Sequence, residues 1–440
     1  MQTITVVGGG LAGCEASLQL ADRGFEVTLV EMRPDQTTGA HRGSDLAEIV
    51  CSNSLKSMRL DTASGLLKAE LDILGARLLA VARANSVPAG HALAVDRESF
   101  SAAMTNTIEH HPHITISRKC QRSLDLPLPA IIATGPLTDS SLLESLSHHI
   151  SAGALFFYDA IAPSIDAASI DMSRCFWASR YGKGEPDYCN VPMDKPTYLT
   201  LIEQLKSADL MPLHAFESER YFESCLPIEV MAARGDDTLR FGPLRPIGLT
   251  DPNSGREPYA LIQLRQEKLD GSLLGLVGFQ TRMTYGSQKK VVRSLPGLEN
   301  AEILRYGAIH KNSFIDTPNA CKPYQMDQQR PGLFYAGQLC GVEGYVECIA
   351  SGLIAALSIA AWSEKREIPT LPQETLLGGL MGFIHTKSKR FQPMNANMGV
   401  VPGLGRKIRN RSERNTLIAD RAIEAMKRFA REQEWFFDSI

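Results

Sequence analysis

The order of apolar and polar positions at the start of the chain predicts a strand, a tight turn and a helix. The run TITVV at residues 3–7 is rich in β-branched residues, and GGGLAG follows it at residues 8–13. Apolar residues then recur with helical spacing, and a second β-type run, FEVTLVE, ends in Glu31. This order is typical of the first β-α-β unit of an α/β sheet.

Two later segments have a related pattern. PAIIATGPL at residues 129–137 predicts a short buried strand that runs into Ala-Thr-Gly. GLFYAGQLCGVEGYVECIASGLIAALSIA, from residue 332, predicts a strand, a glycine-rich turn and a long helix. Residues from about 150 to 320 are instead rich in Pro, Gly, Tyr and Arg, with short alternating runs such as YALIQLRQ. They predict an inserted domain that contains a sheet.

Length and composition fit this division. The chain has 440 residues, of which 44% are hydrophobic and 22% charged, and is long for a single domain. We therefore expect residues 1–150 and 320–440 to form one discontinuous domain and residues 151–319 an inserted α+β domain. The longest apolar runs, such as GLIAALSIAAW, are shorter than the ~20 residues of a membrane span, and no signal-type core is found. We expect a cytoplasmic protein with no membrane partner.

The glycine turn predicts a dinucleotide site. Its glycines permit a tight turn, close approach of a pyrophosphate and close packing of helix on strand, while the helix N-terminus supplies N–H donors. Glu31 is placed to accept hydrogen bonds from a ribose. The predicted cofactor-binding residues are Gly8, Gly9, Gly10, Leu11, Ala12, Gly13, Glu31, Gly337, Gly341, Glu343 and Gly344.

The late glycine-rich segment favours FAD over NAD as the cofactor. A domain that binds NAD at one site does not require a second glycine-rich segment. Flavoproteins of the glutathione-reductase type, in contrast, close their FAD site with such a strand, loop and helix. The segment at residues 129–137 resembles the middle element of the same fold. The predicted fold class is therefore α/β, with a Rossmann-like FAD-binding domain of the glutathione-reductase type.

Charge and cysteine usage add two constraints. The formal net charge is −3, yet residues 385–431 carry twelve lysines and arginines against three acidic residues, a net charge of +9. Such a basic segment indicates a polyanion partner, and FQPMNANMG, at residues 391–399, offers an aromatic ring and amides to an RNA loop. The nine cysteines have no metal-ligand spacing, so neither a metal site nor a disulfide framework is expected.

Several motifs, in order and nearly end to end, resemble one family. They include GGGLAGCEASLQLADRGFEVTLVEMRP, VCSNSLKS, VPAGHALAVDRESF, CLPIEVMAARG, FGPLRPIGL, VGFQTRMTYGSQKKV, AGQLCGVEGYVECIASGL and FQPMNANMG. The chain is similar to the folate- and FAD-dependent bacterial tRNA uracil-5 methyltransferases. The resemblance implies formation of 5-methyluridine in the T-loop of tRNA. It also implies a methylene carbon from 5,10-methylenetetrahydrofolate, a hydride from reduced FAD, and NAD(P)H to recharge the flavin.

That reaction requires a reactive thiol. Carbon 5 of uracil becomes nucleophilic only after a group, usually a thiolate, adds to carbon 6, and a free thiol with a pKa of roughly 8.5 is mostly protonated at neutral pH. Cys51 is one candidate, because Lys56 and Arg59 follow it within about two turns if the next segment is a helix, which Ser52 and Asn53 are suited to cap.

Cys225 is the second candidate, because it lies among turn-type residues just before Pro227 in the expected substrate domain. By resemblance Cys225 is the thiol that adds to carbon 6, and Cys51 handles the proton or the transferred carbon beside the flavin. Cys14, Cys340 and Cys348 are interpreted as structural.

Two other functions stay open at this point. One is a related FAD- and folate-dependent enzyme that modifies a ribosomal RNA uridine or a wobble uridine. The other is a protein of a different class. It is either an FAD-dependent NAD(P)H oxidoreductase, although the CxxxxC motif of the disulfide reductases is absent from the sequence, or an RNA-binding protein that uses FAD structurally.

Overall fold

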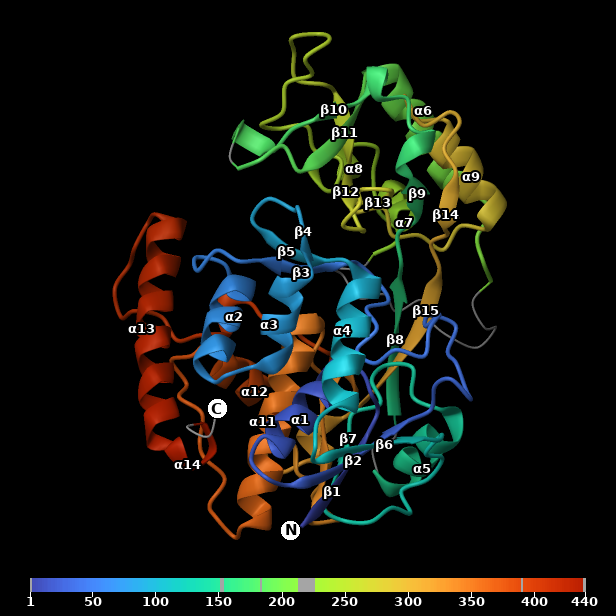
Figure 1. The fold of residues 1–440 in the computed structure, drawn as a ribbon. Coiled ribbons are helices and arrows are strands. Elements are labelled where there is room, and N and C mark those ends of the chain that lie inside the picture. Colours follow the sequence, from blue (N-terminus) through green and yellow to red (C-terminus); the bar gives the residue numbers. More distant parts are fainter. Residues whose placement is uncertain (1, 151–153, 183, 213–225, 389–390, 438–440) are drawn as a thin grey trace.

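The computed structural model describes residues 2–150, 154–182, 184–212, 226–388 and 391–437. A lower part contains a parallel sheet and an upper part contains an antiparallel sheet, and two long strands run between them (Figure 1). Cys225, one of the two predicted catalytic cysteines, lies outside the described residues.

The parallel sheet has the strand order β16-β7-β1-β2-β6, and every pair in it is parallel. Its strands are β1 (Thr3–Val7), β2 (Glu26–Glu31), β6 (Ile114–Arg118), β7 (Ala130–Ile132) and β16 (Leu333–Tyr335). Strands β7 and β16 are entirely buried. Their continuous apolar sequences are those expected of strands that are covered on both faces. The four segments that the sequence predicted as strands, here β1, β2, β7 and β16, therefore lie in one sheet, and the predicted α/β fold is confirmed.

Two apolar helices pack against each other beside this sheet. They are α1 (Leu11–Ala21) and α11 (Tyr345–Ser363). A side chain at Gly352 of α11 would overlap the main chain of Ala12, so glycine permits this close approach. Among the described residues α11 alone is long and apolar enough to cross a membrane, but 83% of its most apolar window is buried inside the protein. The apolar residues of α11 therefore belong to the core of the protein.

Further helices and a small sheet surround the centre of the lower part. The helices are α2 (Ala63–Ile73), α3 (Arg77–Ala84), α4 (Arg97–Glu109), α5 (Ser140–His149), α10 (Thr317–Ala320), α12 (Leu376–His385), α13 (Arg411–Glu432) and α14 (Glu434–Phe437). The small antiparallel sheet consists of β3 (Ser54–Ser57), β5 (Ala92–Val95) and β4 (Ser86–Val87).

The antiparallel sheet of the upper part has the order β10-β11-β12-β13-β9-β14. Its strands are β9 (Ser164–Asp166), β10 (Phe176–Trp177), β11 (Tyr188–Met193), β12 (Ala260–Gln266), β13 (Leu273–Leu276) and β14 (Ile303–Arg305), and its helices are α6 (Lys195–Lys206), α7 (Ile228–Ala233), α8 (Thr238–Phe241) and α9 (Tyr285–Arg293). The two connecting strands are β8 (Ala154–Ala160) and β15 (Ile309–Ile315). The run YALIQLRQ contains β12, as predicted, and the exact domain boundaries stay a prediction.

Candidate functional site

A pocket of about 1020 Å³ lies where the first strands of the parallel sheet end. We call it the turn pocket, because the glycine turn between β1 and α1 forms one wall. The ends of β2 and β7 and the start of the late glycine-rich segment form the others. Its walls include Gly8, Gly9, Gly10, Leu11, Ala12, Glu31, Thr134, Gly135, Gly337 and Gln338. Seven predicted cofactor-binding residues are therefore brought together around one cavity.

The glycines of the turn differ in what a side chain would meet. At Gly8, where φ is +108°, a Cβ atom would lie 2.5 Å from the carbonyl oxygen of Ala133. At Gly13 it would overlap the carbonyl oxygen of Gly8, and Gly13 does not line the pocket. At Gly10 a Cβ atom would meet nothing within 4 Å. Gly8 and Gly13 are thus needed for packing, and Gly10 leaves open space towards the pocket.

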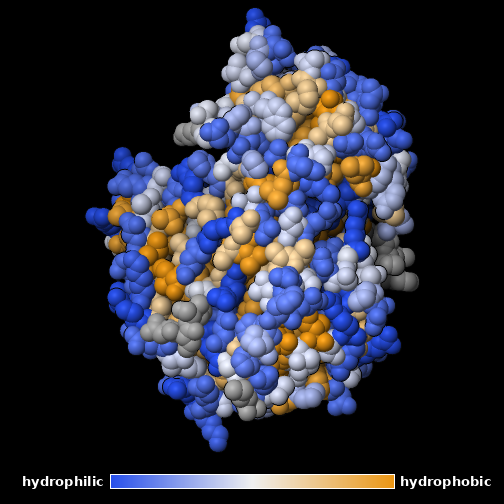
Figure 2. Space-filling view, viewed as in Figure 1, coloured by the Kyte–Doolittle hydropathy of each residue, from blue (hydrophilic) through white to orange (hydrophobic). Residues whose placement is uncertain are grey.

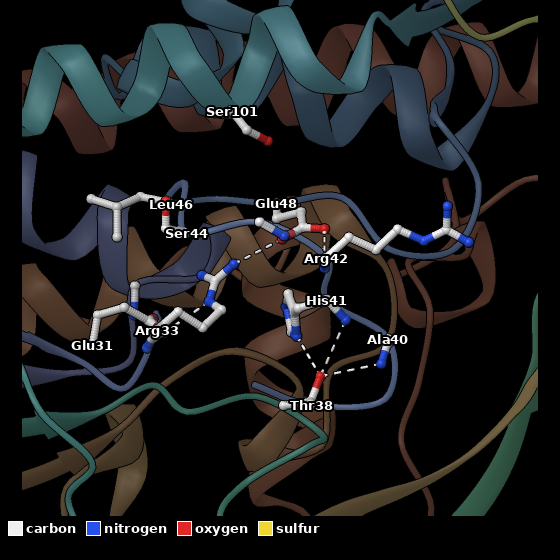
Figure 3. Close-up of polar contacts among 12 residues, drawn as sticks. Glu31, Arg33, Thr38, Ala40, His41, Arg42, Ser44, Leu46, Glu48 and Ser101 are labelled. Carbon is white, nitrogen blue, oxygen red and sulfur yellow. Dashed lines mark hydrogen bonds and ion pairs between the residues drawn. The ribbon is translucent and has the colours of Figure 1, made fainter. Parts of the chain in front are cut away.

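Glu31, at the end of β2, is buried and held by several donors (Figure 3). It accepts hydrogen bonds from the backbone N–H of Gly9 at 2.7 Å and from Nε of Arg33 at 2.8 Å. Burial opposes the charge of Glu31, but Arg33 and the Gly9 amide outweigh it and lower the pKa of the carboxyl group. Arg33 also pairs with Glu48 at 3.0 Å. Glu31 is therefore a fixed, ionised acceptor at the edge of the turn pocket.

A second pocket, of about 1110 Å³, lies next to the first. We call it the thiol pocket, because Cys51 lines it together with Glu343 and Gly344. The residues that line both pockets are Val50, Pro136, Leu137, Gln338, Tyr345 and Cys348. The two pockets therefore share a wall.

Cys51 is held from both sides through its backbone. Its N–H donates to Oη of Tyr345 at 2.9 Å, and its carbonyl oxygen accepts from Nη2 of Arg97 at 2.6 Å. Burial and the charge of Asp159 raise the pKa of the Cys51 thiol, and the charge of Arg97 opposes this only in part. The thiol is therefore protonated at neutral pH.

The predicted helix after Cys51 is wrong. The segment forms strand β3, because Ser54 pairs with Ala94 of β5, and the next helix begins only at Ala63 with Thr62 as its cap. Lys56 has a φ of 64°, which a helix excludes.

The groups expected to lower the pKa of Cys51 are engaged elsewhere. Lys56 pairs with Glu347 at 3.3 Å, and Arg59 pairs with Asp61 at 2.7 Å. Ser52 and Asn53 cap no helix, since their side-chain oxygens accept hydrogen bonds from Arg265. The predicted activation of Cys51 by Lys56 and Arg59 is therefore wrong.

Carboxyl groups gather at the N-terminus of α11, in the thiol pocket. Burial, with the nearby charges of Asp159 and Glu347, raises the pKa of Glu343 well above its usual range, although Gln338 donates a hydrogen bond to it. Burial and the neighbouring carboxylates thus both disfavour the charged form of Glu343. Gly344 has a φ of +117°, and a side chain there would overlap Glu347.

The late glycine segment contributes unequally to the two pockets. Gly337 lines the turn pocket, while Gly341, with a φ of +91°, lines neither and packs against the ring of Phe391. Phe391 is 6% exposed, so its predicted role in stacking with RNA is wrong. Asn395, four residues later, lines the thiol pocket and donates to the carbonyl oxygen of Glu343.

Sequence reasoning missed three residues of the shared wall and its surroundings. Tyr345 bridges the two pockets, and its place directly after Gly344 at the helix start was a usable signal. Cys348, interpreted as structural, lines both pockets, and burial raises its pKa well above the usual range. Arg97 begins α4 some 46 positions after Cys51, and nothing in its local sequence indicated the contact.

Comparisons with known proteins agree with this geometry. A family model described as glucose inhibited division protein A (GidA) matches residues 3–367. A methylenetetrahydrofolate-tRNA-(uracil-5-)-methyltransferase TrmFO of Heliobacterium modesticaldum is 47% identical over 431 residues, which cover 98% of each chain. The TrmFO of Bacillus subtilis is 48% identical and covers 97% of this chain and 98% of that relative. The structure of Aquifex aeolicus GidA superposes with a TM-score of 0.69 at 18% identity, covering 97% of this chain and 73% of that one, which supports the fold.

Proposed function

Because the chain belongs to the GidA family and, within it, to the methylenetetrahydrofolate-tRNA-(uracil-5-)-methyltransferases, we propose that it forms 5-methyluridine in the T-loop of tRNA. The protein is a folate- and FAD-dependent transferase that acts on carbon 5 of a tRNA uracil, with 5,10-methylenetetrahydrofolate and NAD(P)H as cosubstrates. We propose a cytoplasmic location for this activity.

The observation that carries the proposal is the wall shared by the turn pocket and the thiol pocket. The glycine turn and Glu31 would hold a dinucleotide in the first pocket, and Cys51 lies in the second pocket across the shared wall. The residues fit FAD, because Gly10 leaves its backbone open and a helix N-terminus faces the cavity.

We assign the cofactor contacts as follows. The backbone from Gly8 to Ala12 would hold the pyrophosphate, Glu31 would accept a hydrogen bond from a ribose, and Gly337 lines the same pocket beside Ala12. Glu343 and Gly344 line the thiol pocket together with Cys51. Gly13 and Gly341 act through packing alone. When bound and reduced, FAD supplies the hydride that completes the methyl group.

The protein's own groups would activate the uracil. The thiolate of Cys225 adds to carbon 6, which gives carbon 5 the electron density to accept the methylene carbon. Carbon 5 then loses its proton as the tetrahydrofolate nitrogen leaves the methylene carbon, and addition of a hydride to that carbon expels the Cys225 sulfur from carbon 6. Cys51 carries its proton at neutral pH, and this supports a role for it in proton handling more than a role as the standing nucleophile. Glu343, whose pKa is raised by burial and by Asp159, lines the same pocket.

A trapping experiment tests this division of roles. A T-arm fragment with 5-fluorouridine at the target cannot lose a proton from carbon 5, so the covalent adduct persists. We expect Cys51→Ala and Cys225→Ala both to abolish methyl transfer while retaining the fold, because each change removes little buried area. The adduct should form with the wild type and be absent with Cys225→Ala, as seen by denaturing gel electrophoresis.

The other outcomes are equally informative. An adduct with Cys225→Ala but none with Cys51→Ala would reverse the two roles. Full activity in both variants would rule out the thiol mechanism. Mass spectrometry of nucleosides from tRNA and from ribosomal RNA of a deletion strain separates the T-loop assignment from a related activity on another uridine.

A further inference from the structure

The segment from Phe241 to Leu249, in the upper part of the molecule, alternates between buried and exposed side chains. Leu244 and Leu249 are buried, while Phe241 is 71% exposed and Ile247 is 49% exposed. Arg245, between them, is also exposed. Prolines at positions 243 and 246 fix φ and limit the motion of this segment. Exposed apolar side chains are therefore held by a stiff, anchored backbone.

A neighbouring turn, Arg180–Gly182, is attached to the same segment. The guanidinium of Arg180 donates to the carbonyl oxygens of Ile247 at 2.8 Å and Arg245 at 3.0 Å. The N–H of Tyr181 donates to the carbonyl oxygen of Gly248 at 2.7 Å. Tyr181 is 64% exposed, and its ring lies over Gly248, where a Cβ atom would come within 2.8 Å of it. We call the group of Tyr181, Arg240, Phe241, Arg245 and Ile247 the aromatic–arginine surface.

This surface carries positive charge. Arg245 forms no ion pair with any carboxylate among the described residues. Burial and the nearby charge of Arg245 lower the pKa of Arg180, and Tyr181 and Glu257 oppose this only in part, so two guanidinium groups lie close together. The guanidinium carbon of Arg240 is 5.4 Å from the centre of the Phe241 ring and 4.3 Å from that of Tyr259. Rings and arginines are thus interleaved.

The position of the surface indicates which partner it meets. In Figure 1 the green turn Arg180–Gly182 lies on the left of the upper part, on the same side as α13, and Figure 2 shows the molecule hollowed between them. The segment before α13 carries the exposed basic residues Arg406, Lys407 and Arg409. A partner that bridges both regions must be polyanionic and must offer flat apolar groups. Unpaired nucleotides have both properties, since bases stack on aromatic rings and phosphates pair with arginine.

We propose that the aromatic–arginine surface binds unpaired nucleotides of the tRNA substrate, with bases stacked on Tyr181 and Phe241 and a phosphate on Arg245. This inference rests on the proposed function, because it assigns part of the tRNA-binding surface of the same enzyme. Rigid presentation of the rings lowers the entropy cost of binding.

Binding of a complete tRNA transcript, measured by fluorescence anisotropy over a range of salt concentrations, tests the proposal. The double variant Tyr181→Gly, Phe241→Leu removes both rings, and glycine suits the φ of 61° at position 181. Tyr181→Phe with Phe241→Tyr is the matched control, which retains the rings. We expect the first variant to bind on the order of tenfold more weakly or worse with an unchanged salt slope, and the control to bind like the wild type.

Arg245→Gln separates charge from stacking. The variant neutralises one phosphate fewer than the wild type, so the slope of the logarithm of the tRNA-binding constant against the logarithm of the salt concentration should fall by roughly one. Circular dichroism and RNA-independent oxidation of NADH check that each variant is folded and retains its flavin chemistry.

The possible failures can be told apart. If the wild type binds and methylates tRNA while the variant without rings binds within about twofold of it, the surface does not hold nucleotides and this inference is wrong. If the variant without rings binds tRNA like the wild type but sediments as a different oligomer, the surface is a contact between protein chains. That result would also overturn this inference. If the wild type neither binds nor methylates tRNA, the proposed function fails, and this inference fails with it.

Discussion

Gly10 is the residue of the glycine turn where a side chain would point into open space. We expect Gly10→Val to leave the fold intact but to remove or strongly weaken FAD binding, because the added methyl groups occupy the space assigned to the pyrophosphate. The visible flavin absorbance of the purified protein measures how much FAD is bound, and the unfolding temperature shows whether the fold is intact.

Gly13→Ala is the matched control for this prediction. Its new methyl group would overlap the carbonyl oxygen of Gly8, so it should cost about 1–3 kcal/mol in the free energy of unfolding. Equal flavin content in Gly10→Val and the wild type would contradict the assignment of the pyrophosphate. A stable Gly13→Ala protein would show that the turn relaxes more easily than its packing indicates.

At the level of elements, the contact between α2 and α12 depends on one buried carboxyl group. Glu70, on α2, accepts hydrogen bonds from the backbone N–H groups of Leu376 and Leu377, each at 2.7 Å. These are the first amides of α12, which have no partner within their own helix. Burial raises the pKa of Glu70 to about 8, and the two hydrogen bonds oppose the shift without cancelling it.

Because of this raised pKa, the free energy of unfolding should fall as the pH rises. The folded protein holds the proton more tightly than the unfolded chain, so the stabilisation is complete below the ordinary pKa of 4.5 and is lost as the pH rises towards about 8. We expect urea unfolding midpoints to fall across that range in the wild type. The fall should be smaller in Glu70→Gln, which does not titrate.

The same variant should also be less stable at low pH. A glutamine side chain has one oxygen acceptor, so one of the two amides is left without a partner, at a cost of about 1–3 kcal/mol. Glu367→Gln is a suitable control, because Glu367 is exposed and forms no ion pair within the described part of the chain. An identical pH dependence in Glu70→Gln and the wild type would assign the slope to other groups.

At the scale of the whole molecule, the charge is distributed unevenly. The chain carries a net charge of −3, while the exposed basic residues Arg406, Lys407, Arg409 and Arg411 lie together before and at the start of α13. Replacing three of them with glutamine should weaken tRNA binding and reduce the salt slope by roughly one for each phosphate that the protein no longer neutralises. Binding titrations between about 50 and 200 mM salt measure both effects.

Lys289 and Lys290 provide the control for charge. Both are exposed on α9, on the opposite side of the molecule in Figure 1. Replacing them with glutamine changes the net charge without touching the basic segment, so the salt slope should stay as in the wild type. If the two sets of variants lose equal affinity, tRNA responds to the overall charge of the protein and the segment before α13 is not a binding surface.

The sequence by itself determined the features that depend on neighbouring residues. The strand, glycine turn and helix at the N-terminus, the strand at residues 130–132 and the late strand with its long helix follow from apolar runs and glycines. The parallel sheet then brings their ends together, which is why most of the predicted cofactor residues line one pocket.

Only the tertiary structure decided the environment of Cys51. Its segment is a strand because β5 pairs with it, and a distant partner overrides local preference. Its pKa depends on burial and on Asp159 from β8, its backbone is held by Arg97 from α4 and Tyr345 from α11, and none of these lies near it in the sequence. The energy of a charge depends on distance and solvent exposure in space, and the spacing of Lys56 and Arg59 along the chain could not supply either quantity.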